Sequence, residues 1–414
     1  MQTLHKLSKL SAAMNVRART PCFSPSAASP PRVSNLWRPV LAALIAFATC
    51  MVATLALAQE GITANTILLG QSAAMSGAAS ELGNEMRAGA LAYFDFVNAN
   101  GGVNGRKIVL RSLDDGYEPD RAVANTKQLI GPNGVFALFG YVGTPTTLAA
   151  MPVFSRAGVP LVGPFTGAEV FRHPLNRYIF NVRASYFDET DKLVEVLAAL
   201  DLKPIAVFYQ NDAYGQAGLE GVKRAMTKRK LPIAATATVE RNSTDVAQSV
   251  ETISKAAPQA VIMISAYKSC AAFIRAMKAR GAYPQFLNVS FVGSTALANE
   301  LGDAGRGVGI SQVVPLPWYI GTPVVKEYQR LLKASNGKAE FSFTSLEGFI
   351  AAKVMVEGLR RAGRNPTREG LITSLESMKD YDAGGFWVSY SPSDHDGSKF
   401  IELTAIGKDK TFVR

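Results

Sequence analysis

Short apolar stretches alternate with amphipathic segments along most of the chain. The amphipathic segments carry apolar residues at intervals of three and four, which predicts helices with one buried face, and the apolar stretches between them predict buried strands. The expected strands are 67–70, 107–113, 135–139, 159–162, 178–182, 205–209, 233–239, 260–264 and 286–292. The expected helices are 82–97, 119–130, 145–156, 187–200, 216–229, 245–256, 269–280, 323–334 and 344–362.

This alternation predicts the fold class. Strands separated by helices imply right-handed crossovers and mainly parallel sheets that are covered by helices. The series occurs twice, so we expect an α/β protein with two doubly wound lobes and a cleft between them. No Pro- or Ser-rich linker separates the two series, which favours several direct crossings between the lobes over a single tether.

Residues 1–58 are typical of a targeting segment. Basic residues without acidic ones precede the apolar run 40–58, which ends in Ala56-Leu57-Ala58, a small-x-small cleavage pattern. We therefore expect a cleaved signal peptide over 1–58 and a periplasmic protein. The run is long enough for an uncleaved anchor, which stays an alternative. Lipoprotein processing at Cys50 is a poorer match because Thr49 precedes the cysteine.

Charge and cysteine content change with that cleavage. The 414-residue chain has 44 basic and 33 acidic residues, a net charge of +11, and residues 1–58 hold six of the basic ones. The remaining 38 basic and 33 acidic residues give +5, which removes the main support for a nucleic-acid-binding protein. Cys270 is the one cysteine of residues 59–414, so no intramolecular disulfide is expected there.

Motifs for common catalytic chemistry are missing from the sequence. It contains no phosphate-binding P-loop, no Gly-x-Ser-x-Gly turn and no His-Glu-x-x-His zinc motif. His173 and His395 lie in turn sequences, and we expect both to be exposed to solvent. Asp114 and Asp115 are interpreted as turn formers before a helix, rather than as a metal site or an acid/base pair. The prediction is a protein that is not an enzyme, without cofactor, metal or catalytic residues.

A series of short motifs along the chain resembles the branched-chain amino-acid-binding proteins of ABC importers. The motifs are Ala74-Met75-Ser76-Gly77, the glycine-rich segment 97–105, Asp114-Asp115 followed by Pro119, Phe139-Gly140-Tyr141, 159–166, and Asn211-Asp212-Ala213-Tyr214-Gly215. The resemblance implies a type I periplasmic binding protein, in which two Rossmann-like lobes joined by about three hinge crossings close on a small ligand. It places lobe 1 at 59–182 plus 315–383, and lobe 2 at 183–314 plus 384–414.

The same resemblance implies the ligand contacts. They are Leu82, Tyr141, Thr144, Phe165, Thr166, Arg183, Tyr186 and Tyr267. Thr144 and Thr166 would offer hydroxyl groups to a ligand carboxylate, although Thr144 could instead be a plain helix N-cap. A structural role for Arg183 at the hinge is favoured over ligand binding. Tyr214 either covers the pocket mouth or caps a turn.

Two departures from the family pattern bear on the ligand. Amino-acid binders hold the ligand ammonium with an acid in lobe 2, but the corresponding stretch 290–295 contains none, and Leu82 replaces an aromatic residue of the first loop. The expected ligand is therefore a small carboxylate, either amino-acid-like or an aromatic or aliphatic acid. We expect a monomeric binding component that delivers it to an inner-membrane ABC permease. A ligand sensor of the same fold and an exported α/β hydrolase are the alternatives.

Overall fold

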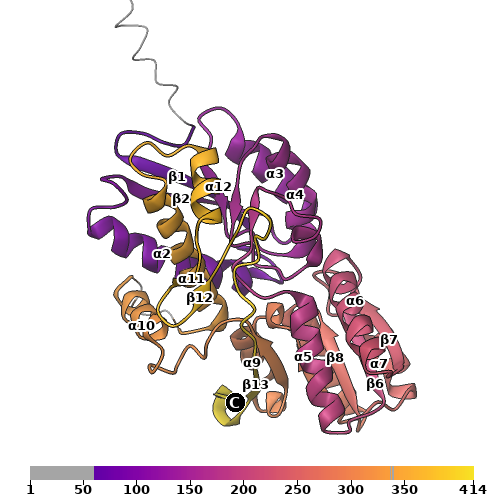
Figure 1. Cartoon of the computed structure of the whole chain (residues 1–414). Coiled ribbons are helices and arrows are strands. Elements are labelled where there is room, and N and C mark those ends of the chain that lie inside the picture. Colours follow the sequence, from indigo (N-terminus) through magenta and orange to yellow (C-terminus); the bar gives the residue numbers. More distant parts are fainter. Residues whose placement is uncertain (1–59, 336, 338–339) are drawn as a thin grey trace, which may run out of the picture. The chain divides into compact units, whose positions relative to one another are not determined.

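The computed structural model describes residues 60–335, 337 and 340–414, so the predicted signal peptide lies outside the described residues. The first sheet has five parallel strands, and we call the part of the molecule around it lobe one (Figure 1). Its order is β2 (Lys107–Asp114), β1 (Thr66–Ala73), β3 (Ala137–Phe139), β4 (Leu161–Val162) and β5 (Ile179–Phe180).

The second sheet has seven strands and forms the centre of lobe two. Its parallel part runs in the order β10 (Gly309–Gln312), β9 (Gln285–Asn288), β8 (Ala260–Ile264), β6 (Ile205–Gln210) and β7 (Ile233–Val239). β13 (Glu402–Ile406) and β14 (Phe412–Val413) extend the β10 edge in antiparallel fashion. The mainly parallel sheets confirm the predicted fold class, whereas the antiparallel addition was not predicted.

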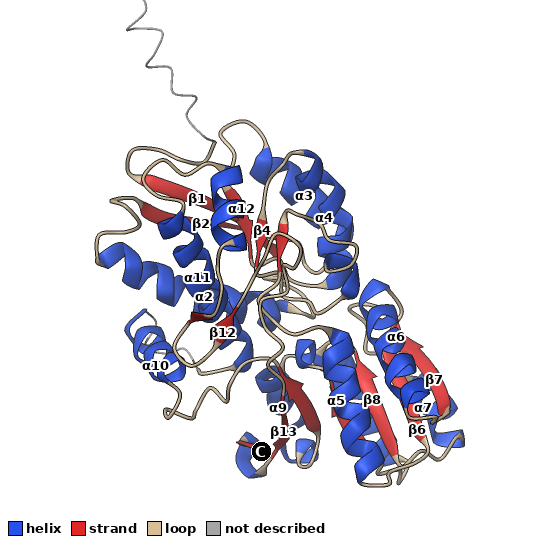
Figure 2. Cartoon of the chain, in the orientation of Figure 1, coloured by secondary structure: helices blue, strands red, loops and turns tan. Residues whose placement is uncertain are grey.

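Helices cover both faces of each sheet (Figure 2). Lobe one carries α2 (Ser80–Ala99), α3 (Pro119–Ile130), α4 (Thr144–Arg156), α10 (Pro323–Ser335), α11 (Phe343–Arg361) and α12 (Arg368–Glu376). Lobe two carries α5 (Tyr186–Ala199), α6 (Ala213–Lys228), α7 (Ala247–Lys255), α8 (Tyr267–Ala279) and α9 (Ser294–Leu301). Within the described residues, no helix combines the length and the apolar character that crossing a membrane requires.

The chain passes between the two lobes at three places, near residues 181–185, 313–322 and 389–401. The first and third crossings are hydrogen-bonded to each other: the Asn181 amide donates to the His395 carbonyl (2.9 Å), and the Gly397 amide donates to the Asn181 carbonyl (2.8 Å). A short hairpin of β11 (Tyr381–Asp382) and β12 (Trp387–Val388) precedes the third crossing. The exact lobe boundaries stay a prediction.

Helices α2 and α11 pack closely through glycines. A Cβ atom on Gly89 would lie 1.7 Å from the Ser345 carbonyl oxygen, and one on Gly348 would lie 2.1 Å from the Met86 carbonyl oxygen. A side chain at either position would therefore push the two backbones apart. This contact explains how α11, more than 200 residues later in the chain, is fixed against the first helix of lobe one.

Two predictions about local structure are wrong. The strand expected at 286–292 ends at Asn288, and a 3-10 turn follows over Ser290–Val292, because the Ser290 amide donates to the Glu189 carboxylate (2.7 Å) instead of a neighbouring strand. His395 is 2% exposed, not solvated as expected. Its ring stacks on Phe180 at 3.9 Å between centroids, and burial lowers its pKa. His173 is exposed as expected.

Candidate functional site

The carboxyl ends of the parallel strands of both lobes point toward the same region between the lobes. In doubly wound sheets this edge is where ligands bind, because the loops there carry free backbone groups and helix N-termini. The loops after β3 and β4 come from lobe one, and those after β6, β8 and β9 come from lobe two. Five side chains meet at the lobe interface. They are Thr144, Phe165 and Thr166 after β3 and β4, Arg183 after β5, and Tyr186 at the start of α5.

Two threonine hydroxyls of lobe one form the first feature of the site. Thr144 Oγ1 and Thr166 Oγ1 are 2.7 Å apart, and both side chains are buried. The N-cap of α4 is Gly143, and Thr144 makes no capping hydrogen bond, so its alternative interpretation as a plain N-cap is wrong. Gly143 has a φ of 100°, which turns the chain so that Thr144 becomes the first helical residue. The hydroxyl is thereby directed to Thr166.

Five aromatic rings form an interlobe aromatic cluster. Its members are Tyr117 and Phe165 from lobe one, and Tyr186, Tyr214 and Phe291 from lobe two. The Phe291 ring centroid lies 5.2 Å from Phe165, 4.6 Å from Tyr214 and 6.0 Å from Tyr117. Each of the five side chains is at most 1% exposed. The lobes are therefore closed on each other, since opening them would separate Phe291 from the lobe-one rings.

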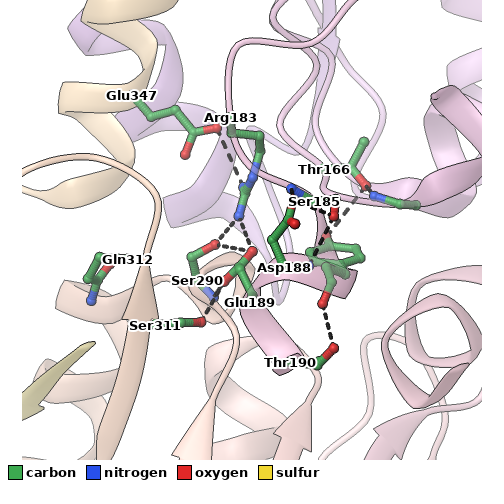
Figure 3. Close-up of polar contacts among 12 residues, drawn as sticks. Thr166, Arg183, Ser185, Asp188, Glu189, Thr190, Ser290, Ser311, Gln312 and Glu347 are labelled. Carbon is green, nitrogen blue, oxygen red and sulfur yellow. Dashed lines mark hydrogen bonds and ion pairs between the residues drawn. The ribbon is translucent and has the colours of Figure 1, made fainter. Parts of the chain in front are cut away.

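A buried ion cluster lies beside these rings (Figure 3). Arg183 Nη2 donates to Glu189 Oε1 (2.9 Å) and to the Ser290 hydroxyl, and Nη1 lies 3.5 Å from Glu347 Oε1. The Ser290 amide and the Ser311 hydroxyl donate to Glu189 Oε2, at 2.7 and 2.6 Å. Both terminal nitrogens of Arg183 are thus engaged by protein groups, which fits the structural role favoured from the sequence. We define Arg183, Glu189, Ser290, Ser311 and Glu347 as the hinge ion cluster.

The electrostatics of this cluster follow from its burial. Burial acts to lower the pKa of Arg183, but Glu347 and Glu189 outweigh it and hold that pKa above its usual value. Burial raises the pKa of Glu347 to about 7, although Arg183 opposes the shift. Arg183 also lies over the Phe165 ring, with Cζ 5.1 Å from the centroid, so the charge borders the aromatic cluster.

Leu82 and Tyr267 both lie beside Gly293, at a second point between the lobes. A Cβ on Gly293 would lie 2.5 Å from Leu82 Cδ2 and 3.7 Å from Tyr267 Cδ1, so the bare backbone of Gly293 lets α2 approach lobe two. A pocket of about 440 Å³ opens beside Tyr267. Its lining consists of Ser80, Glu81, Glu85, Tyr267, Lys268, Ala296, Asn299 and Glu300. Burial raises the pKa of Glu85 to about 7.

The remaining predicted contact, Tyr141, stands apart from the aromatic cluster. Its side chain is 1% exposed, and its hydroxyl lies 2.9 Å from the Thr126 hydroxyl of α3. Thr144, Phe165, Thr166, Arg183 and Tyr186 are brought together, with Thr166 Oγ1 3.4 Å from the Tyr186 hydroxyl. Whether any of the eight residues contacts a ligand stays a prediction.

Three further polar side chains lie at the carboxyl edge of the second sheet, and we call them the cleft polar edge. Gln210 ends β6, Ser265 follows β8, and Tyr214 is the second residue of α6. All three are buried, and among the described residues Gln210 Oε1, the Tyr214 hydroxyl and the Ser265 hydroxyl have no hydrogen-bond partner. The capping group of α6 is Asp212, so the turn-capping interpretation of Tyr214 is wrong. Its hydroxyl is available instead.

A polar clasp joins the lobes at the edge of the interface. Arg241 Nη2 donates to Glu118 Oε2 at 2.8 Å, and Asn242 Nδ2 donates to Glu118 Oε1 at 2.8 Å and to the Gly116 carbonyl at 3.1 Å. Arg241 and Asn242 follow β7 in lobe two, whereas Gly116 and Glu118 follow β2 in lobe one. These hydrogen bonds can form only when the lobes are closed.

The paired acids after β2 hold a loop in place. Asp114 Oδ1 accepts from the amides of Met75, Ser76 and Gly116, and Asp115 Oδ1 accepts from the Tyr117 amide. This agrees with their interpretation as turn formers. Across residues 60–335, 337 and 340–414, no three His, Cys, Asp or Glu side chains are grouped closely enough to hold a metal ion.

Sequence reasoning missed several residues of the interface: Tyr117, Glu118, Glu189, Gln210, Arg241, Asn242, Ser265, Phe291 and Ser311. A usable signal existed for Gln210 and Ser265, because polar residues that end buried strands of a parallel sheet lie at the ligand edge. Glu189 gave a weaker signal, since it occupies a buried position of an amphipathic helix. No sequence signal of this kind indicated the clasp, because Arg241 and Glu118 are 123 positions apart in the chain.

Comparison with known proteins agrees with this architecture. Residues 66–410 match the family model described as periplasmic binding protein. A Leu/Ile/Val-binding protein homolog 3 from Brucella melitensis is 24% identical over 350 residues, covering 78% of this chain and 87% of the relative. Among solved structures, a possible leucine/isoleucine/valine-binding protein from Rhodopirellula baltica has 35% identity and a TM-score of 0.81, and covers 85% of this chain and 97% of that chain. A substrate-binding periplasmic protein from Ralstonia solanacearum has 36% identity and a TM-score of 0.80, with 84% and 99% covered. The chain belongs to the periplasmic binding protein family, with the type I fold of two Rossmann-like lobes.

Proposed function

We propose that the protein is the periplasmic substrate-binding component of an ABC importer and closes on a small solute that carries a carboxylate. The observation that carries the proposal is the buried hydroxyl pair of Thr144, the first residue of α4, and Thr166, which follows β4. The first amides of a helix lack intrahelical acceptors and favour an anion. The hydroxyl that accepts the hydrogen bond within the pair keeps its own proton to donate to the same anion. An anionic ligand head therefore fits this position.

The surroundings of the hydroxyl pair favour an apolar ligand body. The aromatic cluster supplies five buried rings next to Thr166, and Tyr186 is shared between the two features. Burial of an apolar body against such rings contributes about 25 cal/mol per Å² of area removed from water. The ligand head would thus fix orientation, and its body would supply much of the free energy of closure.

Within the described residues, a free α-amino group at the hydroxyl pair would find the carboxylates of the hinge ion cluster already paired with Arg183. The stretch 290–295 contributes Phe291 to the interface rather than an acid, and Glu189 is already engaged by Arg183, Ser290 and Ser311. A pocket lined by residues of α2, α8 and α9 contains the carboxylates of Glu81, Glu85 and Glu300. An amine would have to reach that pocket to be neutralised. Simple acids are therefore favoured over branched-chain amino acids as ligands.

The test is a calorimetric titration of the purified protein with leucine, valine, aliphatic acids and aromatic acids. Binding of simple acids is expected, and Thr166→Val should weaken it by about ten- to hundredfold, because a hydrogen bond to a charged group contributes about 1.5–3 kcal/mol. Thr146→Val is the matched control, since the Thr146 hydroxyl donates to the Val142 carbonyl inside lobe one. Its affinity should stay unchanged.

Two results would contradict the carboxylate proposal. One is binding of the amino acids alone, with loss of affinity in Glu85→Gln, which would place the ammonium in the acidic pocket. The other is binding of acids that Thr166→Val leaves unchanged. Uptake of the bound acid by intact cells then separates transport from sensing, because deletion of the gene abolishes uptake only if the protein serves a permease.

The absence of catalysis and the exported state belong to the same proposal. A binding component forms and breaks no covalent bond, so the ligand recovered after denaturing the complex should be chemically identical to the one added. Amino-terminal sequencing of the periplasmic protein should begin at Gln59 if the signal peptide is cleaved after Ala58.

A further inference from the structure

We propose that the ligand carries a second polar group, uncharged and able both to donate and to accept hydrogen bonds, which is held by Gln210, Tyr214 and Ser265 of lobe two. This inference rests on the proposed function and adds the chemistry of the end of the solute opposite its carboxylate. A hydroxyl or a primary amide meets the requirement.

The first reason is that the cleft polar edge is buried without partners. Gln210, Tyr214 and Ser265 are each 0% exposed, and one polar atom of each has no hydrogen-bond partner in the described parts of the chain. Buried polar groups in native proteins are almost always hydrogen-bonded, because leaving one unsatisfied forfeits its hydration. Three such atoms at one sheet edge indicate a bound partner.

The second reason is their common position. Tyr209 of β6 pairs in register with Ile264 of β8, so Gln210 and Ser265, the next residues, leave the sheet side by side at its carboxyl edge. The Tyr214 ring lies 4.6 Å from Phe291 and 5.4 Å from Tyr186. These neighbours place Tyr214 in the aromatic cluster, which also contains Phe165, the residue before Thr166. A ligand that spans the cluster from the hydroxyl pair would reach lobe two at this edge.

The third reason is the charge state of this region. The Asp212 carboxylate is occupied, because Oδ1 caps α6 through the Tyr214 amide (2.9 Å) and Oδ2 accepts from Gln210 Nε2 (2.6 Å) and Arg241 (3.4 Å). Those bonds also orient the Gln210 amide, since Nε2 must face the carboxylate and Oε1 remains the free acceptor. A ligand ammonium at this end would lack a free counter-charge, and a second carboxylate would face the Gln210 carbonyl oxygen.

The three free atoms define what the ligand must present. Gln210 Oε1 only accepts, so the ligand group must donate one hydrogen bond. The hydroxyls of Tyr214 and Ser265 can donate, so the same group can accept from them. Burial raises the pKa of Tyr214 well above its usual value, which keeps its proton available as a donor. A hydroxyl or primary amide satisfies all three.

The experiment measures dissociation constants by calorimetry for four classes of probe built on one arylalkanoic acid. They are the parent acid, its ring-hydroxylated isomers, its ring carboxamides and its aminomethyl derivatives. We expect at least one hydroxylated or carboxamide form to bind about five- to tenfold more tightly than the parent, as one or two buried hydrogen bonds would give. The aminomethyl forms should bind no better than the parent.

Variants then assign the preference to the cleft polar edge. Tyr214→Phe should remove most of the advantage of the hydroxylated or carboxamide form over the parent acid, and Ser265→Ala should act in the same direction. Tyr209→Phe is the matched control: it removes a hydroxyl from β6 that is outside the cleft polar edge and should leave the ratio unchanged.

The outcomes separate this inference from the proposed function. If the parent acid binds and no polar substituent improves it, or if Tyr214→Phe leaves the ratio intact, the neutral polar group is disproved and the carboxylate receptor stands. If the aminomethyl acids bind best, the inference is also overturned. If no acid binds at all, the proposed function itself fails.

Discussion

Two buried polar groups at the lobe interface differ in how completely their atoms are satisfied. In the hinge ion cluster, Glu189 accepts hydrogen bonds from Arg183, Ser290 and Ser311, and both terminal nitrogens of Arg183 have acidic or hydroxyl partners. In the cleft polar edge, Gln210, Tyr214 and Ser265 each keep a buried atom without a partner within the described residues. In the first group the Glu189 carboxylate and both terminal nitrogens of Arg183 have protein partners, and only Arg183 Nε lacks one within the described residues. In the second group an acceptor oxygen and two hydroxyls are left without partners.

This difference is a more useful guide to function than residue type. Arg183 has the chemistry of a carboxylate-binding residue, yet its partners are protein carboxylates. Tyr214 and Ser265 have ordinary chemistry, yet their hydroxyls are available when the lobes are closed. The polar groups of the hinge ion cluster stabilise the fold through their protein partners, and the unsatisfied groups of the cleft polar edge are those that the proposed ligand would satisfy.

The largest expected effect comes from breaking the hinge ion cluster. Glu189→Ala leaves the guanidinium of Arg183 buried with Glu347 as its remaining carboxylate partner, and should lower the free energy of unfolding by about 3–5 kcal/mol. Urea unfolding of the ligand-free protein measures it. Glu195→Ala on the same helix is the control, because Glu195 pairs with Lys192 at the surface and should cost less than about 1 kcal/mol. A loss below that value in Glu189→Ala would erase the contrast between the two regions.

A second expected effect concerns pH. The pKa of Glu347 is raised from 4.5 to about 7 by burial, so the folded state binds its proton more tightly than the unfolded state does. The stability that this proton supplies is complete below pH 4.5 and is lost as the pH rises through 7. Glu347→Gln, which cannot ionise, should therefore lose less stability between pH 5 and pH 8, by up to about 3 kcal/mol.

The measurement is urea unfolding at several pH values for both proteins. Glu357→Gln on the same helix is the control, because Glu357 pairs with Arg361 near the surface, and its profile should follow the unsubstituted protein. Parallel profiles for Glu347→Gln and the unsubstituted protein would mean that Glu347 is ionised in the fold across this whole range. The hinge ion cluster would then carry more negative charge than burial suggests.

The smallest expected effect concerns the clasp, whose hydrogen bonds form only when the lobes are closed. Arg241→Ala should weaken ligand binding by about two- to fivefold without touching the ligand, because a partly exposed ion pair contributes about 0.2–1 kcal/mol. The difference in ligand affinity between Arg241→Ala and the unsubstituted protein should shrink at high salt. Adding Glu118→Ala to Arg241→Ala should weaken binding little further, because the ion pair is already broken. Arg229→Ala is the control, since Arg229 pairs with Asp191 within lobe two. Equal affinities for Arg241→Ala and Arg229→Ala would show that the clasp does not contribute to closure.

Much of the fold follows from the sequence pattern. The helix 119–130 and the strands 233–239 and 260–264 were predicted with the bounds that the structure has. These elements have strong periodicity and clear turn residues at both ends, so local information is sufficient. The short antiparallel strands β13 and β14 were not predicted, because they form by pairing with the distant edge of β10.

The candidate site was predicted less completely, for a physical reason. Resemblance located Thr144, Phe165, Thr166, Arg183 and Tyr186, which the structure brings together. Burial of His395 and the partners of Arg183 depend on segments that are far apart in the chain, such as His395 on Phe180. No local pattern records such contacts, and the partnerless state of Tyr214 can be recognised only once its surroundings are known.

The hydrogen bonds between the first and third crossings have a consequence for how the lobes can move. Asn181 is bonded in both directions to the segment that holds His395 and Gly397, and Arg172 ties this pair together by donating to the Arg183 carbonyl (2.8 Å) and to Asp396 (2.7 Å). Because the two crossing segments are hydrogen-bonded to each other, they have to bend together. Twisting or sliding of one segment past the other would break these hydrogen bonds. We therefore expect closure to be mainly a rotation of the lobes about these paired crossings.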